Sequence, residues 1–100
     1  MSQELTDNTD RSRYEFSAEG AISFIDYRRS SGVVALTHAE VPRELEGRGV
    51  GSRMARAVLD AIRARGEKVI PQCSFVAAFI RRHPEYQDLA TPETRKAYQI

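Results

Sequence analysis

The sequence has little of several features that would assign it to a particular class of protein. Its single cysteine, Cys73, excludes an internal disulfide and a cysteine-rich zinc site, so no metal is expected. A net charge of +1 provides no general attraction for nucleic acid or anionic lipid. The longest apolar run, residues 75–80, is too short to cross a bilayer, and the N-terminus lacks the apolar run of a signal peptide. These absences predict a cytoplasmic protein that binds neither membranes nor nucleic acid.

Length and composition predict one globular domain. A chain of 100 residues can bury a single two-layered core but not a second one. Its hydrophobic fraction of 41% and charged fraction of 29% are typical of a folded domain rather than of a disordered chain. Residues 1–11 are polar, acidic and without a period, which indicates a flexible N-terminal arm. We therefore expect a single domain over residues 12–100.

Alternating polar and apolar residues predict three antiparallel strands. Residues 13–17 and 21–27 alternate on either side of Gly20, as in a β-hairpin with its turn near that glycine. After a second turn at residues 28–32, residues 33–41 are expected to form a third strand. The first part of the chain is therefore expected to be a meander.

A helical period follows a glycine-rich turn at residues 47–52. Gly66 is the expected end of this helix, and residues 68–72 should then form a short strand parallel to the third one or beside it. Ser74 is the expected N-cap of a second helix over residues 75–82. The fold class is mixed α/β, an antiparallel meander followed by a βαβα arrangement. The apolar side chains of the two helices are expected to form the core without contacting a ligand: Val50, Met54, Ala57, Val58, Ala61, Ile62, Phe75, Val76, Phe79 and Ile80.

The glycine-rich turn has the properties of an anion-binding site. Gly47, Gly49 and Gly51 allow backbone conformations and close approaches that a Cβ would prevent. The first N–H groups of the following helix have no intrahelical partner, and with the helix dipole they favour a phosphate group. The turn lacks the Lys-Ser or Lys-Thr pair of a Walker A loop, and it is not set in the βαβ unit of a dinucleotide-binding motif. The alternative is a turn and helix start that binds no ligand.

This turn and several segments around it resemble the GNAT superfamily of acyl-CoA N-acetyltransferases. Residues 47–52, Gly-Arg-Gly-Val-Gly-Ser after an antiparallel strand, match the pyrophosphate loop of that superfamily. Residues 24–27, 36–42 and 68–86 are in addition similar to the small, single-domain GNAT-like acetyltransferases. The resemblance implies a minimal GNAT acyl-CoA N-acyltransferase fold and acetyl-CoA as cosubstrate.

The resemblance also implies how acetyl-CoA is held. The pyrophosphate is expected on the backbone N–H groups of the loop, with Arg48 as a candidate side chain for a phosphate, and the pantetheine is expected to run along the third strand. Glu46 departs from the superfamily pattern, which usually has Gln or Arg there. Its carboxylate would repel a pyrophosphate, so it must point away if affinity is to be kept. The expected cofactor-binding residues are Ala39, Val41, Gly47, Arg48, Gly49, Val50, Gly51 and Ser52.

His38 and Glu40 are candidates for the proton transfer that acetylation of an amine requires. They lie two residues apart on the third expected strand, so they project from one face about 7 Å apart. The amine must lose a proton before it can attack the thioester, and Glu40 is the first candidate to accept it, followed by His38. The alternative is a histidine beside the core and an exposed glutamate, with ordered water removing the proton.

Cys73 is the third candidate catalytic residue. It lies between the last strand and the N-terminus of the second helix, a position that favours a thiolate, and a cysteine matches it in the small acetyltransferases that the chain resembles. It could carry an acetyl intermediate, reprotonate the thiolate of CoA, or only fill space. Larger GNAT enzymes usually have a tyrosine on the second helix that acts as the acid. The nearest positions in this chain are Phe79 and Ile80, which cannot donate a proton. Cys73, Tyr86 or solvent must then supply it.

The sequence therefore predicts an acetyl-CoA-dependent N-acetyltransferase, as a monomer or weak homodimer. The acceptor amine, on a protein, a peptide or a small molecule, is not identified by any motif. The alternative is a non-catalytic CoA-binding or protein-interaction module, which Glu46, Phe79 and Ile80 favour.

Overall fold

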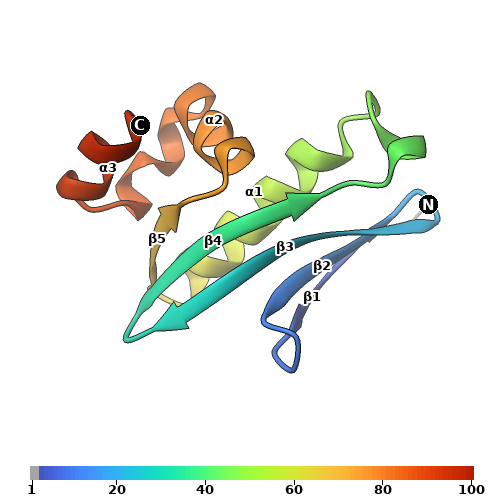
Figure 1. Ribbon diagram of the computed structural model, residues 1–100, viewed down its shortest axis with the longest axis horizontal. Coiled ribbons are helices and arrows are strands. Elements are labelled where there is room, and N and C mark those ends of the chain that lie inside the picture. The colour runs from blue at the N-terminus through green and yellow to red at the C-terminus, as the bar shows by residue number, and fades with distance from the viewer. Residues whose placement is uncertain (1–2) are drawn as a thin grey trace.

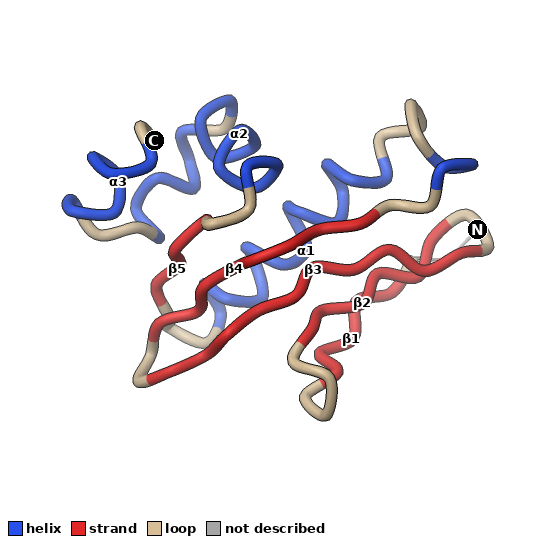
Figure 2. The backbone as a smooth tube through the Cα atoms, in the orientation of Figure 1, coloured by secondary structure: helices blue, strands red, loops and turns tan. Residues whose placement is uncertain are grey.

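A five-stranded sheet with its strands in chain order organises the fold of the computed structural model, which describes residues 3–100 (Figure 1). The first four strands are antiparallel, and the fifth is parallel to the fourth. Figure 2 shows the helices gathered on one side and at one end of the sheet. The strands are β1 (Glu4–Asn8), β2 (Arg13–Ala18), β3 (Ala21–Ser30), β4 (Val33–Glu40) and β5 (Lys68–Pro71). The helices are α1 (Val50–Ala64), α2 (Ser74–Arg82) and α3 (Pro92–Tyr98), with 3-10 turns at Arg43–Leu45 and Pro84–Leu89.

The expected meander is confirmed by β2, β3 and β4. The turn between β2 and β3 consists of Glu19 and Gly20, both with positive φ, 56° and 79°. This is the conformation of the tight two-residue turn that matches the twist of a hairpin. After α1, β5 lies parallel to β4, as the helical crossover predicts. The mixed α/β fold is therefore confirmed.

Residues 4–8 correct the prediction of a flexible arm. They form β1, which pairs with β2 from Glu4 opposite Ser17 to Asn8 opposite Arg13. The strand is mostly polar, and only Leu5 packs against the core. The strand is instead held in place by its backbone pairing with β2 and by the polar contacts of Asp7 described below. Residues 1–2 of the expected arm lie outside the described residues.

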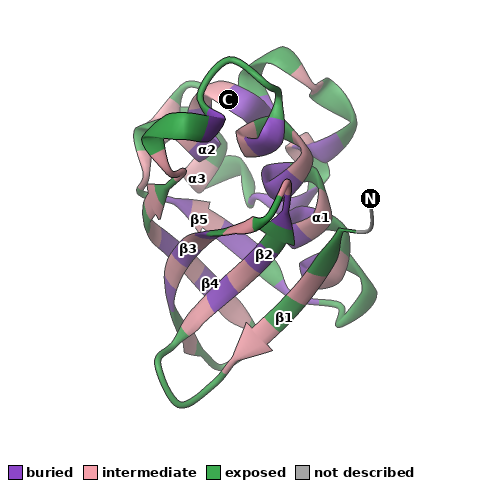
Figure 3. Cartoon of the chain, turned by 90° about the vertical axis from the view of Figure 1, so that its right-hand side faces the viewer, coloured by how far each residue is buried: buried purple, intermediate pink, exposed green. Residues whose placement is uncertain are grey.

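The core lies between α1 and one face of the sheet. Burial alternates along β2, β3 and the first part of β4, so one face is buried and the other exposed (Figure 3). The outer face of β1 to β4 carries only half-buried or exposed residues. Ala57 and Ala61 of α1 were expected in the core but are only half-buried, because the buried face of the helix is turned toward Ala55 and Leu59. The buried residues of α1 are Val50, Met54, Ala55, Val58, Leu59 and Ile62.

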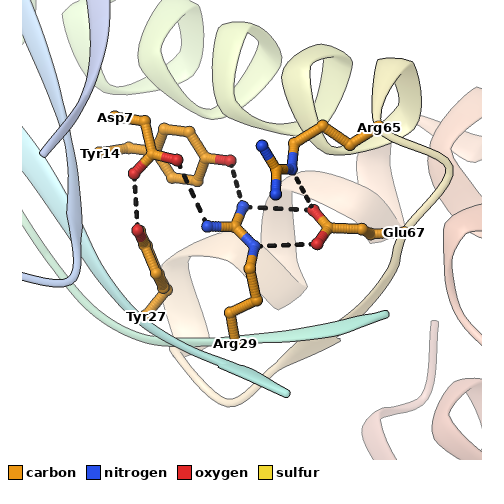
Figure 4. Close-up of polar contacts among 6 residues, drawn as sticks. All are labelled: Asp7, Tyr14, Tyr27, Arg29, Arg65 and Glu67. Atoms are coloured by element: carbon orange, nitrogen blue, oxygen red, sulfur yellow. Dashed lines mark hydrogen bonds and ion pairs between the residues drawn. The ribbon is translucent and has the colours of Figure 1, made fainter. Parts of the chain in front are cut away.

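A polar network joins β1 to the rest of the sheet near the C-terminal end of α1 (Figure 4). At its centre, the guanidinium of Arg29 donates to both carboxylate oxygens of Glu67, at 2.9 and 3.2 Å. The same group donates to the hydroxyl of Tyr14 at 2.7 Å and to Asp7 at 3.3 Å. Asp7 also accepts a hydrogen bond of 2.6 Å from Tyr27. The network therefore connects β1, β2 and β3 to the loop after α1.

Tyr27 is expected to make stability depend on pH in the alkaline range. Burial, followed by the hydrogen bond to Asp7, raises the pKa of Tyr27 from 10.0 to about 12. The folded state therefore holds this proton more tightly than the unfolded chain does. Its contribution to the free energy of unfolding is complete below pH 10, and it is lost as the pH rises toward 12.

Urea titrations through this alkaline range measure the effect as a fall in the free energy of unfolding. The Tyr27→Phe variant should be less stable at neutral pH by about 1 kcal/mol, because the bond to Asp7 is lost. Its stability should also fall less steeply as the pH rises. A slope equal to that of the unsubstituted protein would contradict this role of Tyr27.

The C-terminal segment packs beside α1 at the β5 end of the sheet. Helix α2 begins at Ser74, but Cys73 is its N-cap, so the expected cap at Ser74 is wrong by one residue. The helix ends at Arg82, before Pro84, as expected. Tyr86 in the following 3-10 turn donates a 2.8 Å hydrogen bond to Asp60 of α1. Within the described part of the chain, no helix has both the length and the apolar character to span a membrane.

Candidate functional site

The strands β4 and β5 separate part-way along β4 and leave an open strand edge. They pair only from Val33 opposite Lys68 to Leu36 opposite Pro71. The N–H of Cys73 donates to the carbonyl of Leu36 at 2.8 Å, and the chain then turns away into α2. Beyond Leu36, β4 continues to Glu40 with β3 as its only strand partner among residues 3–100. An extended ligand can therefore pair with this edge as an added strand would.

The glycine-rich loop follows directly after that edge. Gly47 and Gly49 have φ values of 82° and 75°, which favour glycine, and Gly49 is the N-cap of α1. No side chain caps this helix, and its first intrahelical bond runs from the N–H of Arg53 to the carbonyl of Gly49 at 3.1 Å. The N–H groups of residues 50–52 are therefore free of intrahelical partners, at the positive end of a 15-residue helix. This geometry suits a phosphate group.

A pocket of about 380 Å³ joins the loop to the open edge of β4. Gly51 lies close to its wall, because a Cβ placed there would come within 2.9 Å of Cζ of Phe75 and 3.5 Å of Cγ2 of Val41. Both of those side chains also line the pocket, so the missing Cβ leaves space within it. The lining residues are Ala39, Val41, Leu45, Glu46, Gly47, Gly49, Val50, Gly51, Ser52 and Phe75. Seven of the eight residues expected to bind the cofactor are among them.

Three lining residues were missed by sequence reasoning. Phe75 was expected in the core, but it is only half-buried and forms a wall of the pocket. Phe75 is the second residue of α2, and this helix begins beside the open edge of β4. Its position in the sequence could therefore have indicated a pocket residue. Leu45 is buried at the end of the 3-10 turn and forms another part of the lining. Glu46 is a lining residue of this pocket as well.

Arg48 is the expected cofactor residue that does not line the pocket. Its guanidinium lies 3.6 Å from the carboxylate of Glu19, in the β2–β3 turn. The same carboxylate lies 3.8 Å from the guanidinium of Arg53, in the first turns of α1. Glu19 therefore stands between two cations at the rim of the glycine-rich loop.

His38 and Glu40 are in direct contact on the outer face of the sheet. Nε2 of His38 lies 3.2 Å from Oε2 of Glu40, and both side chains are exposed. A β-bulge places them there: Tyr27 pairs with Leu36 and Asp26 with His38, which leaves Thr37 without a partner. The extra residue reverses the alternation, so His38 faces away from the core although Leu36, two residues earlier, is buried.

A second hollow, of about 350 Å³, lies on this outer face beside Glu40. It shares Val41 and Glu46 with the pocket at the glycine-rich loop, so the two spaces have a common wall. The second hollow is lined by Ile22, Phe24, Glu40, Val41, Pro42, Arg43 and Glu46.

Comparisons with known proteins identify the family. Residues 13–89 match the family described as GCN5-related N-acetyl-transferase. The chain belongs to this GCN5-related N-acetyltransferase family. The NMR solution structure of a GCN5-like protein from Staphylococcus aureus superposes with a TM-score of 0.67 at 26% identity, covering 88% of this chain and 87% of that one. No curated protein matches the chain.

Family membership confirms the GNAT-type fold expected from the sequence, and the family as a whole supports acyl transfer. Within this family member, Cys73 is half-buried at the N-cap of α2. No hydrogen bond joins its Sγ to His38 or Glu40 among residues 3–100. The structure thus brings His38 and Glu40 into contact on the outer face, whereas Cys73 lies at the edge of β4 where β5 separates from it.

Tyr86, the other candidate for proton donation, is buried and hydrogen-bonded to residues of α1. Its hydroxyl donates to Asp60 and accepts a 3.2 Å hydrogen bond from Arg56. Burial and then the bond to Asp60 raise the pKa of Tyr86, which makes it a weaker acid. Phe79 and Ile80 are fully buried, and Phe79 stacks on His83 with ring centroids 4.0 Å apart. Among residues 3–100, no group of His, Cys, Asp and Glu side chains is placed to hold a metal ion.

Proposed function

We propose that this member of the GCN5-related family is an acetyl-CoA-dependent N-acetyltransferase. The observation that carries the proposal is the meeting of two features in one pocket: free helical N–H groups and an unpaired strand edge. The first suits a pyrophosphate and the second suits the amide groups of a pantetheine chain. An acyl-CoA carries both groups in sequence, so it can use the whole pocket.

In this proposal each part of the cofactor has a defined place. The pyrophosphate accepts hydrogen bonds from the backbone of residues 47–52, and the pantetheine lies along Ala39 to Val41. The fit supports these places, because Gly51 leaves room where a Cβ would stand. Glu46 is the opposing feature, since it is a lining residue of the same pocket and a carboxylate directed into that pocket would repel a phosphate. We expect the Glu46 side chain to turn toward solvent when the cofactor binds.

The proposed reaction is direct transfer between two substrates. The neutral amine nitrogen attacks the thioester carbonyl, the carbon–sulfur bond breaks while the nitrogen gives up its extra proton to water, and the acetyl group leaves CoA as an amide. The amine first gives up a proton, which we assign to Glu40 through water, with His38 sharing the charge across their 3.2 Å contact. The CoA thiolate then takes up a proton from Cys73 or from solvent.

The experiment that tests this function combines binding with turnover. Acetyl-CoA at about a hundredfold above its Kd should add about 2.7 kcal/mol to the free energy of unfolding. Incubation with a panel of amines and peptides should then release free CoA thiol. Binding without thiol release above spontaneous hydrolysis would favour a non-catalytic CoA-binding module, and no binding at millimolar acetyl-CoA would contradict both functions.

Cys73 is expected to leave no acetyl adduct, because transfer is direct. Intact mass measured after rapid quenching of the protein with acetyl-CoA should show the unmodified chain. Turnover in Cys73→Ala should fall but persist, since solvent can also protonate the leaving thiolate. An acetyl adduct that disappears in Cys73→Ala would instead assign Cys73 as a nucleophile.

Replacing Glu19 by glutamine is expected to strengthen binding of CoA. The carboxylate competes with ligand phosphates for Arg48 and Arg53, so its removal leaves both cations available. We expect a gain of about two- to fivefold in affinity, the range of exposed ion pairs. Calorimetric titration measures it, and raising the salt concentration should reduce it. Weaker binding in Glu19→Gln would mean that Glu19 positions the arginines instead.

A further inference from the structure

We propose that a phosphate bound at the rim of the glycine-rich loop loosens the tip of the β2–β3 hairpin and the start of β1. The coupling runs through Arg48 and Arg53, two arginines that contact the hairpin and the N-terminal segment. It rests on the proposed function and adds a conformational response to that same cofactor site. Figure 1 shows the β2–β3 turn at the same end of the molecule as the loop that leads into α1.

Glu19 occupies a position that a phosphate group can take over. Its carboxylate lies 3.6 Å from the guanidinium of Arg48 and 3.8 Å from that of Arg53, which is longer than a close charge-assisted hydrogen bond. Both arginines adjoin pocket-lining residues in the chain. A phosphate monoester carries up to about two negative charges and three strong acceptor oxygens, so it should bind this pair of cations more strongly than the carboxylate does.

The backbone of Glu19 shows why the hairpin tip responds when its side chain is displaced. Glu19 has a φ of 56°, in the left-handed region that glycine, asparagine and aspartate adopt most readily. A glutamate in this conformation is strained, and its contacts with the two arginines help to offset that strain. A phosphate that takes the arginines removes this support, so the turn becomes more mobile.

Arg53 extends the response to β1. Its guanidinium donates a 2.8 Å hydrogen bond to Oε1 of Gln3, the residue before β1. Glu4, the first residue of β1, pairs with Ser17, two residues before Glu19. Both contacts of Arg53 therefore support the same end of the antiparallel sheet, and a phosphate that draws Arg53 toward the loop releases the strand start and the hairpin tip together.

The other end of β1 provides an internal control. Asp7 accepts hydrogen bonds from Arg29 at 3.3 Å and from Tyr27 at 2.6 Å. This network lies near the C-terminal end of α1, whereas the glycine-rich loop lies at its N-terminal end (Figure 4). The loosening should therefore stop before Asp7, which separates it from a general loss of stability.

Nitrogen-15 relaxation of the full chain, with and without saturating CoA, tests the coupling. The order parameters of Glu4 and Gly20 should fall from about 0.85, the value of a rigid backbone, toward about 0.6, and that of Asp7 should not change. Amide shifts in residues 47–52 report in the same spectra that CoA is bound. Bound CoA with unchanged or higher order parameters at Glu4 and Gly20 would overturn the coupling alone. Absence of any amide shift would contradict the proposed function, and the coupling with it.

A second ligand, 3′-dephospho-CoA, identifies the phosphate that takes the arginines. It keeps the pyrophosphate and lacks the phosphate monoester. Loosening of Gly20 by this ligand would assign the pyrophosphate, and binding without loosening would assign the 3′-phosphate; either result supports the coupling when CoA itself loosens the tip. Sodium chloride at matched ionic strength is the control, and equal loosening by chloride would overturn the proposal.

Two matched variants test the role of the carboxylate. Glu19→Gln should give a low order parameter at Gly20 before any ligand is added, and CoA should lower it little further. Glu15→Gln should respond to CoA as the unsubstituted protein does, because Glu15 of β2 contacts Asn8 and no arginine among the described residues. The same response to CoA in both variants would overturn the proposal.

Gln3→Ala tests the coupling in the opposite direction. A contact that CoA binding breaks must oppose that binding, so its removal should raise the affinity for CoA about twofold, in the range of exposed polar contacts of charged groups. Calorimetric titration measures the change. Unchanged or weaker binding in Gln3→Ala would overturn the part of the proposal that concerns β1.

Discussion

Replacing Glu67 by alanine is expected to lower the free energy of unfolding by about 3 kcal/mol. The Glu67 carboxylate is 9% exposed and accepts two hydrogen bonds from Arg29, whose side chain is 18% exposed. Removing the carboxylate leaves a mostly buried guanidinium without its main counter-charge, which typically costs 3–5 kcal/mol, at roughly the lower end here because Asp7 and Tyr14 remain as partners. Urea unfolding measures the loss, which is large for a domain of this size.

Arg65→Ala is the matched control for that variant. Arg65 contacts the same carboxylate at 3.0 Å, but its side chain is 54% exposed. Its removal leaves Glu67 paired with Arg29, so the loss should stay below about 1 kcal/mol. An equal loss of stability in both variants would mean that burial does not determine how much the Arg29–Glu67 pair contributes to the free energy of unfolding.

Replacing Gly51 by alanine is expected to weaken CoA binding about tenfold, or by about 1.4 kcal/mol. The new Cβ would stand 2.9 Å from the ring of Phe75 and would occupy part of the pocket proposed for the cofactor. The chain should nevertheless fold, because alanine is favoured over glycine in a helix by up to about 1 kcal/mol and Cζ of Phe75 is the far end of a side chain. Calorimetric titration with CoA gives the affinity, and thermal unfolding reports the fold.

The double variant Gly51→Ala with Phe75→Leu is the control for this steric argument. Leucine lacks the ring atom that the Cβ would approach, so the double variant should recover part of the lost affinity. Phe75→Leu alone should bind CoA more weakly than the unsubstituted protein, because it removes a wall of the pocket. Unchanged affinity in Gly51→Ala would place the cofactor outside this pocket.

The parts of the fold that follow from the sequence are those determined by local signals. Glycines at 20, 47, 49 and 66 adopt positive φ at the turns and helix ends where the sequence predicts them. Helix α1 follows from its apolar period, and β5 from the crossover that precedes it. The backbone conformation of the glycine-rich loop was therefore predictable at Gly47 and Gly49, whereas its role as a cofactor site stays a prediction.

The parts that were missed depend on contacts between distant residues. Strand β1 has one apolar side chain, Leu5, and its Asp7 is held by Arg29, 22 positions away. The bulge at Thr37 has no local signal in an alternating strand, yet it decides which face His38 and Glu40 occupy. Phe75 has the pattern of a core residue, and only the separation of β4 from β5 places it in a pocket.

Strand β1 has a consequence for how the protein behaves at high concentration. It covers the free edge of β2, whose alternating apolar side chains would make an exposed edge a template for pairing with another chain. The strand that becomes the new edge is short and carries Glu4 and Asp7, features that discourage edge-to-edge association. Loosening β1 from Arg29 should therefore appear first as aggregation, before any loss of helix content.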